Sequence, residues 1–132
     1  MRKPRLTKDE TEEHSIKECP IFLTLTLIAN KWSIRILGQL LNAPKNTLRF
    51  NQLKHAMNGI SQRELTKHLR EFEKSGIVTR MVYAEMPLRV EYTLTKLGKT
   101  LCDPIQALSN WADKYGASVH KMRQEFEHRK ND

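Results

Sequence analysis

The segment GISQRELTKHLREFEKSG, residues 59–76, carries the signals that decide the fold. Ser61 and Glu64 stand three residues apart, which is the spacing of a capping box, in which each side chain bonds a free backbone N–H of the other residue. Ile60 and Leu65 occupy the two positions of a hydrophobic staple around this start. The segment therefore predicts a helix whose first turn is fixed by local contacts.

The predicted helix has one apolar and one polar face. Leu65, Leu69 and Phe72 fall on one stripe at helical spacing, and Gly76 suits the left-handed residue that follows a helix. We expect the apolar face in the core and the polar face at the surface. The polar face carries five side chains that can form hydrogen bonds: Gln62, Arg63, Thr66, Lys67 and Arg70.

The residues before this helix complete a helix-turn-helix. Residues 51–57 place Leu53 and Met57 four apart, as in a short helix, and Asn58-Gly59 is a turn signal. The second helix of such a motif lies in the major groove of DNA with its first residues at the base edges. Ser61 at its start is also a candidate for DNA contact, and this helix end would direct a partial positive charge toward the same DNA.

The side chains of the polar face suit that position. Arg63 can bond a guanine through two donors, Gln62 can do the same for an adenine, and Thr66 can meet a thymine methyl group. Lys67 and Arg70 lie further along the helix and are expected to contact phosphates. The alternative is that this is a solvated face that binds nothing, as most polar helix faces are.

A β-hairpin is expected behind the helix. Residues 77–83 are β-branched and aromatic, and residues 90–94 alternate apolar and polar side chains. The two segments can therefore pair across a loop that contains Pro87. A hairpin at this place is the wing of a winged helix-turn-helix.

Two arginines flank the loop of the predicted wing. Arg80 and Arg89 are candidates for DNA contact, because an arginine of a wing can enter a narrow minor groove. The alternative for Arg89 is an ion pair with Glu85 or Glu91. Both interpretations of Arg89 stay open at the level of the sequence.

Two further helices and a strand are expected upstream. Leu23–Leu27 alternates like a strand, but Cys19-Pro20 favours a helix start, because proline is tolerated in the first turn. Lys31–Asn42 predicts a clearer helix with one apolar stripe, and Pro44 ends it. Thr47–Arg49 is a candidate short strand.

The last part of the chain keeps helical spacing of apolar residues to Phe126. Thr95 is expected to cap this region, Pro104 to kink or restart it, and Leu97 and Leu101 to join the core. The apolar stripe is longer than one small core can cover, so part of it is expected to meet a second subunit. The candidates for that contact are Leu108, Trp111 and Tyr115.

The net charge of +8 is concentrated in one part of the chain. Residues 31–80 hold ten Lys/Arg against three Glu, whereas residues 1–18 are balanced and residues 81–132 are nearly so. A positive field over the predicted helix-turn-helix is what binding a polyanion requires. Charge alone supports nucleic-acid binding and mere solubility about equally.

Length and composition fit one domain of 132 residues. We expect a cytoplasmic protein without a membrane partner, because we find neither a long apolar span nor the apolar core of a secretion signal. Two cysteines are too few for a disulfide framework. The histidines do not cluster at ligand spacing, and no nucleophile elbow, paired carboxylates or phosphate-binding glycine loop is found. We therefore expect no metal, no cofactor and no enzymatic activity.

Several motifs in this order resemble one family. They are Cys19-Pro20, Lys31-Trp32, the runs at residues 48–53, 59–66 and 73–76, and Arg89 to Thr95. Residues 19–111 are similar to the HxlR-type regulators, winged-helix proteins of bacteria and archaea related to the MarR group. The resemblance implies a homodimer on a palindromic operator, with terminal helices in the dimer contact. Asn30 departs from a common Gly, and Leu88 departs from a common second Pro of the wing.

Cys19 is the candidate regulatory residue. A thiol at a helix start meets the positive end of the helix dipole, which favours the reactive thiolate. Some members of the family sense quinones, aldehydes or hypochlorite through the matching Cys-Pro cysteine, so the resemblance implies a thiol-reactive effector. The alternative is that Cys19 is only a small residue that starts the helix. Cys102 is expected to be a buried small hydrophobe.

The sequence thus predicts a mainly α fold with a small β-hairpin, a winged helix-turn-helix with extended C-terminal dimerisation helices. Four segments are expected: a flexible charged arm (1–18), an N-terminal helix (19–30), a DNA-binding core (31–94) and dimerisation helices (95–132). The predicted function is sequence-specific binding of double-stranded DNA by a homodimeric transcription regulator. The alternative is a winged-helix protein-interaction module, which would need an exposed apolar patch in place of the basic face.

Overall fold

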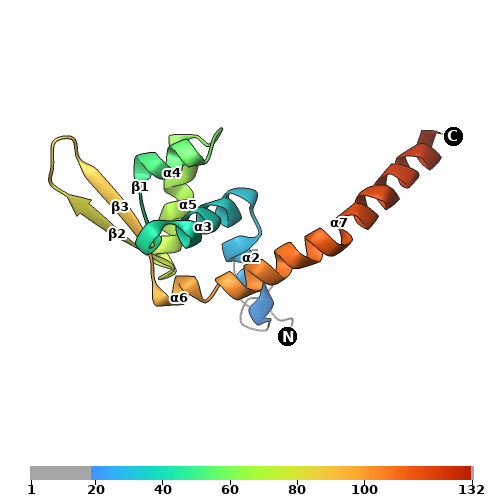
Figure 1. Ribbon diagram of the computed structural model, residues 1–132, viewed down its shortest axis with the longest axis horizontal. Coiled ribbons are helices and arrows are strands. Elements are labelled where there is room, and N and C mark those ends of the chain that lie inside the picture. Colours follow the sequence, from blue (N-terminus) through green and yellow to red (C-terminus); the bar gives the residue numbers. More distant parts are fainter. Residues whose placement is uncertain (1–18, 132) are drawn as a thin grey trace, which may run out of the picture.

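The computed structural model describes residues 19–131 and has mainly helices around one small sheet (Figure 1). The predicted arm, residues 1–18, lies outside the described residues. The helices are α2 (Pro20–Ile28), α3 (Lys31–Asn42), η1 (Pro44–Asn46, a 3₁₀ turn), α4 (Phe50–Ala56), α5 (Gln62–Lys74), α6 (Lys96–Lys99) and α7 (Cys102–Asn131). The strands are β1 (Thr47–Arg49), β2 (Val78–Tyr83) and β3 (Arg89–Leu94). The predicted fold class, a winged helix-turn-helix, is confirmed.

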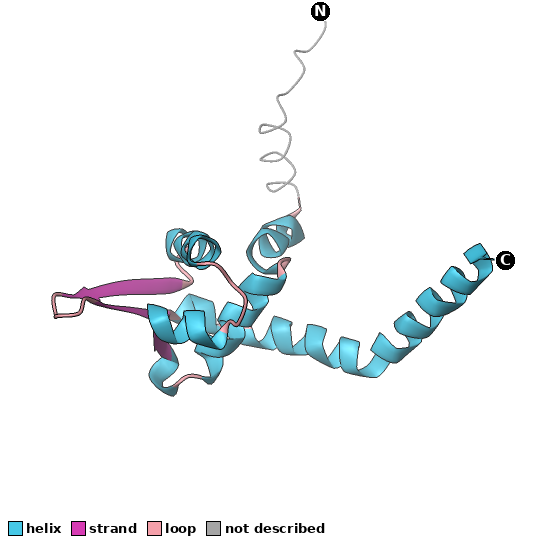
Figure 2. Cartoon of the chain, turned by 90° about the horizontal axis from the view of Figure 1, so that it is seen from above, coloured by secondary structure: helices cyan, strands magenta, loops and turns pink. Residues whose placement is uncertain are grey.

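The sheet is antiparallel, with the strand order β1-β3-β2. Val78 pairs with Leu94 and Tyr83 with Arg89, so the hairpin ladder is continuous to the edge of the loop. Thr47 pairs with Thr93, which adds β1 as a third strand to the predicted hairpin. The hairpin and α7 project from the core in opposite directions, as Figures 1 and 2 show.

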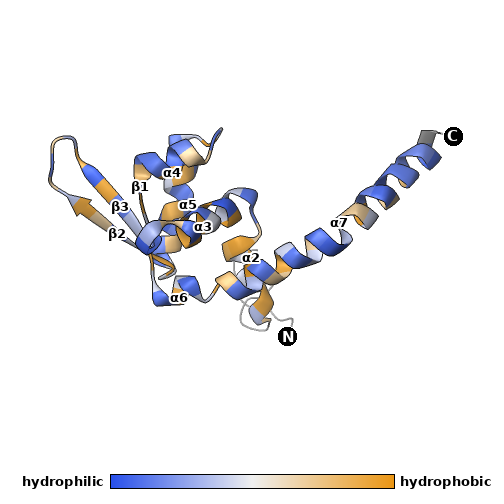
Figure 3. Cartoon of the chain, viewed as in Figure 1, coloured by the Kyte–Doolittle hydropathy of each residue, from blue (hydrophilic) through white to orange (hydrophobic). Residues whose placement is uncertain are grey.

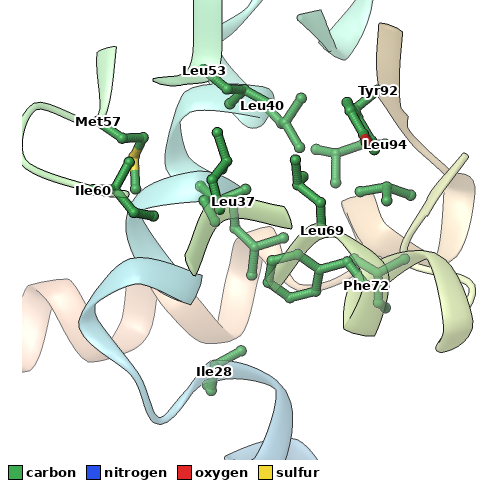
Figure 4. Packing of buried hydrophobic residues seen from close by; sticks show 14 residues of the cluster. Ile28, Leu37, Leu40, Leu53, Met57, Ile60, Leu69, Phe72, Tyr92 and Leu94 are labelled. Carbon is green, nitrogen blue, oxygen red and sulfur yellow. The ribbon is translucent and has the colours of Figure 1, made fainter. Parts of the chain in front are cut away.

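The core lies where α3, α4 and α5 pack against the inner face of the sheet (Figure 4). It includes the apolar stripe predicted for α5, because Leu65, Leu69 and Phe72 are buried. Ile60 and Leu65, the residues of the predicted staple, both belong to this cluster. The other buried apolar residues are Ile28, Ile36, Leu37, Leu40, Leu53, Met57, Ile77, Val78, Tyr92 and Leu94.

Local signals set both ends of α5. Ser61 Oγ accepts a hydrogen bond from the Glu64 backbone N–H at 3.1 Å, which is the first half of the predicted capping box. Glu64 does not complete the box, because its Oε2 turns toward His68 Nε2, 3.5 Å away. At the other end Gly76 has φ +76°, and the Ile77 N–H donates to the Phe72 carbonyl at 2.9 Å. This is a Schellman ending, which turns the chain into β2.

The two upstream helices form as predicted. Pro20 occupies the first turn of α2, and this helix start prevails over the strand-like alternation of Leu23–Leu27. Asn30 departs from the glycine common in the resembling family and has a structural role here. Its side chain accepts a hydrogen bond from the Trp32 N–H at 2.8 Å and so caps α3.

Pro104 lies in the first turn of α7, so the predicted restart of the last helical region is confirmed. Two expectations about its surroundings are wrong. Leu97 is not in the core but 55% exposed, because the single turn of α6 presents it outward, whereas Leu101 packs against the core. Cys102 is exposed and not buried, because it is the first residue of α7, which leads away from the core.

Gly98 ties α6 closely to the sheet, a contact that sequence analysis did not predict. A Cβ atom at this position would lie only 2.3 Å from the Ile77 carbonyl oxygen and 2.9 Å from Leu94 Cδ2. Thr95 caps the same turn, since its Oγ1 accepts from the Gly98 N–H at 3.0 Å. The turn of α6 therefore requires glycine for its close approach to the backbone of residue 77.

No single helix among residues 19–131 has the length and apolar composition to cross a membrane. Helices α2 and α3 pass such a test only when taken together, and they are bent by 79° relative to each other.

Candidate nucleic-acid interface

The outer face of α5 gathers the polar side chains that the sequence singled out. They sit at helical spacings of three and four residues, so they share one face. Glu64 and Glu71 border the same hollow. The predicted residues that line this open hollow are Gln62, Arg63, Thr66, Lys67 and Arg70.

The burial of α5 separates its two faces clearly. Leu65 and Leu69 are fully buried, whereas Arg63, Lys67 and Arg70 are exposed. The ion pairs found within residues 19–131 involve His68 and Arg89, so the three cations of α5 keep their charge free of described carboxylates. A positively charged helix face of this kind can approach phosphates without first breaking an ion pair.

Ser61 and Thr66 complete the predicted set on α5. Ser61 is exposed, and its hydroxyl oxygen already accepts the capping hydrogen bond from Glu64, which leaves the hydroxyl hydrogen free to donate. Thr66 is half-buried between Arg63 and Arg70 on the outer face. Both residues can therefore contact a polar ligand placed against the start and middle of α5.

Arg80 and Arg89 are not brought together by the wing. Successive side chains of a strand point to opposite faces. Arg80 pairs with Tyr92 in the ladder, whereas Arg89 pairs with Tyr83, so the two arginines lie on opposite faces of the hairpin. Arg80 is exposed on β2.

Arg89 takes the ion-pair alternative. Its Nη2 lies 3.2 Å from Glu85 Oε1, and its Nε lies 3.6 Å from Glu91 Oε1. Its guanidinium carbon stands 3.9 Å from the ring centroid of Tyr83, and the side chain is only 25% exposed. The arginine therefore holds the base of the wing loop together, and its contact with DNA stays a prediction.

His68 is a contact of α5 that sequence analysis missed. Its Nδ1 lies 3.3 Å from Ser33 Oγ on α3, and its Nε2 faces Glu64 at 3.5 Å. The ring is almost fully buried, so it links the recognition helix to the helix behind it. The spacing of Glu64 and His68, four residues apart, was the signal that could have indicated half of this contact.

Cys19 is at the N-cap position of α2, as predicted, and it is half-buried. Its side chain makes no capping hydrogen bond. Cys102, at the start of α7, is also a free thiol. The structure thus offers two thiols, one partly shielded and one open to solvent.

Helices α2 and α7 contain apolar residues, coloured orange in Figure 3, and several of their side chains are exposed to solvent. The three residues predicted for a dimer contact are among them: Leu108, Trp111 and Tyr115. Trp111 and Tyr115 pack ring against ring, with centroids 5.5 Å apart. The remaining large exposed apolar residues of these two helices are Ile21, Phe22, Leu23, Leu25, Met122 and Phe126.

The part of the chain that the structure describes contains no group of three or more His, Cys, Asp or Glu side chains that could hold a metal ion. The site consists of a cationic, hydrogen-bonding helix face beside a projecting hairpin.

Comparison with known proteins places this geometry in a family context. The HxlR-like helix-turn-helix family model matches residues 27–120. The HTH-type transcriptional regulator YdeP of Bacillus subtilis (strain 168) is 36% identical over 122 residues, which are 92% of each chain.

Solved structures of a redox regulator and of a further transcriptional regulator are similar as well. The redox regulator HypR in its reduced form shares 33% identity at a TM-score of 0.70, over 78% of this chain and 99% of that one. The reduced transcriptional regulator YodB of B. subtilis shares 33% identity at a TM-score of 0.65, over 74% of this chain and 93% of that one. The arrangement of helices and wing described above thus recurs in transcription regulators.

Proposed function

The chain belongs to the HxlR-like helix-turn-helix family, and from that premise we propose that it acts as a homodimer that reads a palindromic operator with α5 in the major groove. It is a DNA-binding transcription regulator of the winged helix-turn-helix class. The main support for operator recognition by α5 is its outer face. Exposed cationic and amide side chains lie there, on the opposite side of the helix from a buried apolar stripe. The proposed activity is binding alone, without a catalytic step.

The order of side chains along α5 assigns their roles. Gln62 and Arg63 stand in the first turn, where a recognition helix meets base edges, and their bidentate chemistry fits adenine and guanine. Lys67 and Arg70 lie one and two turns later and are proposed to contact phosphates. Specific affinity would then come from the first turn, and salt-dependent affinity from the later ones.

Fluorescence anisotropy tests the proposal. The reduced protein should keep binding the DNA upstream of its own gene in the presence of excess random competitor, and the affinity should fall steeply with salt. Binding that is lost to the competitor would place the operator elsewhere. Failure to bind any DNA would favour the alternative, a winged-helix protein-interaction module.

The exposed apolar residues of α7 support the proposed homodimer. Large apolar faces are rare on monomeric proteins, and a two-fold symmetric contact would cover the same face on both copies. Such a dimer would set the two α5 helices roughly 34 Å apart, about one turn of DNA.

We predict that Trp111→Glu dissociates the dimer. A buried tryptophan at an interface contributes about 2 kcal/mol or more, so the dissociation constant is expected to rise about thirtyfold or more. Sedimentation equilibrium at micromolar concentration measures this change. Ser109→Glu is the matched control, because it adds the same charge to the same helix on another face. A wild-type protein that sediments as a monomer would contradict the proposal.

Cys19 is proposed to make the regulator responsive to thiol-reactive electrophiles or oxidants. The support is its position at the start of α2 and the similarity to HypR and YodB, the first of which is described as a redox regulator. A group added to Cys19 would displace the exposed apolar side chains of α2 next to it, and through them would change the proposed dimer contact.

We expect Cys19, in a Cys102→Ala background, to react with iodoacetamide at neutral pH faster than a free thiol such as N-acetylcysteine. The reason for this expectation is the position of Cys19 at the N-cap of α2, where its side chain makes no capping hydrogen bond. Cys19→Ala should keep DNA affinity and lose its sensitivity to diamide. If Cys19 reacts no faster than the free thiol, its role is only structural, as the residue that starts α2.

A further inference from the structure

The tip of the wing is apolar where a charged tip would be expected in a DNA-binding hairpin. Met86 is 99% exposed and Leu88 is 63% exposed, and both belong to the loop between β2 and β3. Figure 3 colours the neighbouring outer end of β2 as hydrophobic as well. Nothing in the described part of the chain covers this tip, which projects away from the core (Figure 1).

Most of the charged side chains of the wing form ion pairs with one another. Residues 78–94 contain two arginines and two glutamates. Arg89 contacts both glutamates and lies against the ring of Tyr83. This leaves Arg80, on the opposite face of the hairpin and well before the loop, as the cation without such a partner among the described wing residues. An entry of Arg89 into a groove would therefore have to break these contacts first.

The same ion pairs make the tip able to approach DNA. Glu85 adjoins Met86, and a free carboxylate there would be repelled by phosphates. Because Glu85 Oε1 lies 3.2 Å from Arg89 Nη2, its charge is partly offset, and with Arg80 the formal charge of residues 78–94 is zero. The pairing of β2 with β3 extends to Tyr83 and Arg89. Met86 and Leu88 therefore lie on a short loop whose two ends are held together by the strands.

We propose that Met86 and Leu88 form an apolar wedge that enters the minor groove beside the recognition site and partly unstacks one base step. Apolar side chains, methionine and leucine among them, act in this way in proteins that kink DNA from the minor groove. DNA is the proposed occupant because the wing continues directly from the DNA-binding helix: α5 passes through the tight turn at Gly76 into β2, and β2 leads to the tip. The inference rests on the proposed binding of α5 in the major groove.

The wedge would contribute specificity without hydrogen bonds to bases. Pyrimidine–purine steps such as TA and CA/TG unstack most easily, so they are favoured where the tip lies. The operator would then contain a preferred flexible step flanking each half-site, at a position that no polar side chain reads.

The experiment uses the full-length dimer and duplexes that the wild type selects from a random library. The fluorescence of 2-aminopurine placed at the flanking step reports unstacking, and anisotropy reports affinity. The wild type should raise the fluorescence. Met86→Gln should abolish the rise and weaken binding to the preferred step about tenfold, the lower range for losing one base-pair preference.

Met81→Gln is the matched control, since Met81 is 58% exposed but lies within β2, away from the loop. This variant should behave as the wild type does. A Met86→Gln protein with unchanged affinity and unchanged fluorescence rise would overturn the wedge while leaving the proposed function intact, and the tip would then be available to a protein partner. A wild type that selects no duplex would overturn both.

Discussion

Replacing Arg63 with alanine is expected to remove most of the preference of this protein for its operator. Arg63 is exposed in the first turn of α5 and free of described acidic partners, so its two parallel donors are available to one guanine. Such a contact discriminates between bases by about 1–3 kcal/mol, which is roughly a five- to 150-fold loss per half-site. In a symmetric dimer the loss applies twice.

Lys67→Ala separates this effect from simple loss of charge. Lys67 lies one turn further along the same face, where a phosphate contact is proposed. Its removal should weaken binding to the operator and to random DNA by similar factors and lower the salt slope by about one. Anisotropy titrations of both variants on both DNAs measure the difference. An Arg63→Ala protein that loses affinity equally on operator and random DNA would contradict base recognition by Arg63.

Replacing Leu69 with alanine is expected to destabilise the fold strongly. Leu69 has no exposed surface and lies in the core between α5, α3 and the sheet. Removing a buried leucine side chain costs about 2–5 kcal/mol, because transfer free energy is lost and a cavity remains. That is a large part of the about 5–15 kcal/mol by which domains of this kind are stable.

Leu97→Ala is the control for Leu69→Ala, since Leu97 is 55% exposed. It should change the free energy of unfolding by no more than about 0.5 kcal/mol. Urea denaturation at one fixed protein concentration measures both values, because the stability of a dimer depends on concentration. Equal costs for the two variants would mean that α5 does not bury the face assigned to it.

The sequence was sufficient where short-range signals act alone. The start of α5 follows from Ser61, which caps the helix although Glu64 does not complete the predicted box, and its end follows from Gly76 as predicted. The restart of the last helix at Pro104 is likewise a local effect of a residue without an N–H group. The cationic, amide and hydroxyl side chains on the outer face of α5 could be listed from spacing, because helical periodicity fixes which side chains share a face, but Glu64 and Glu71, which border the same hollow, were not in that list.

Features that depend on long-range contacts could not be predicted. The pairing of β1 with β3 joins residues more than forty positions apart, and Gly98 is required by the carbonyl of Ile77. His68 bonds Ser33 on another helix, so spacing along α5 shows only its contact with Glu64. Leu97 fits the helical stripe of the sequence and is nevertheless exposed, because α6 ends after one turn.

Arg89 shows how a candidate site residue can be ambiguous until its neighbours are placed. Its sequence context allowed either a DNA contact or an ion pair. The strand register brings Tyr83 opposite it, and both Glu85 and Glu91 reach its guanidinium group. The exposed residues that remain at the tip of the wing are apolar, which a search for basic residues alone does not find.

Methylation interference on a duplex selected by the wild-type protein shows whether α5 lies in the major groove, because dimethyl sulfate modifies guanine N7 there. We expect two clusters of interfering guanines, related by two-fold symmetry and about 10–10.5 base pairs apart, with one guanine in each cluster silent in Arg63→Ala. Binding without any interfering guanine, equally strong on random DNA, would contradict the placement of α5 in the major groove.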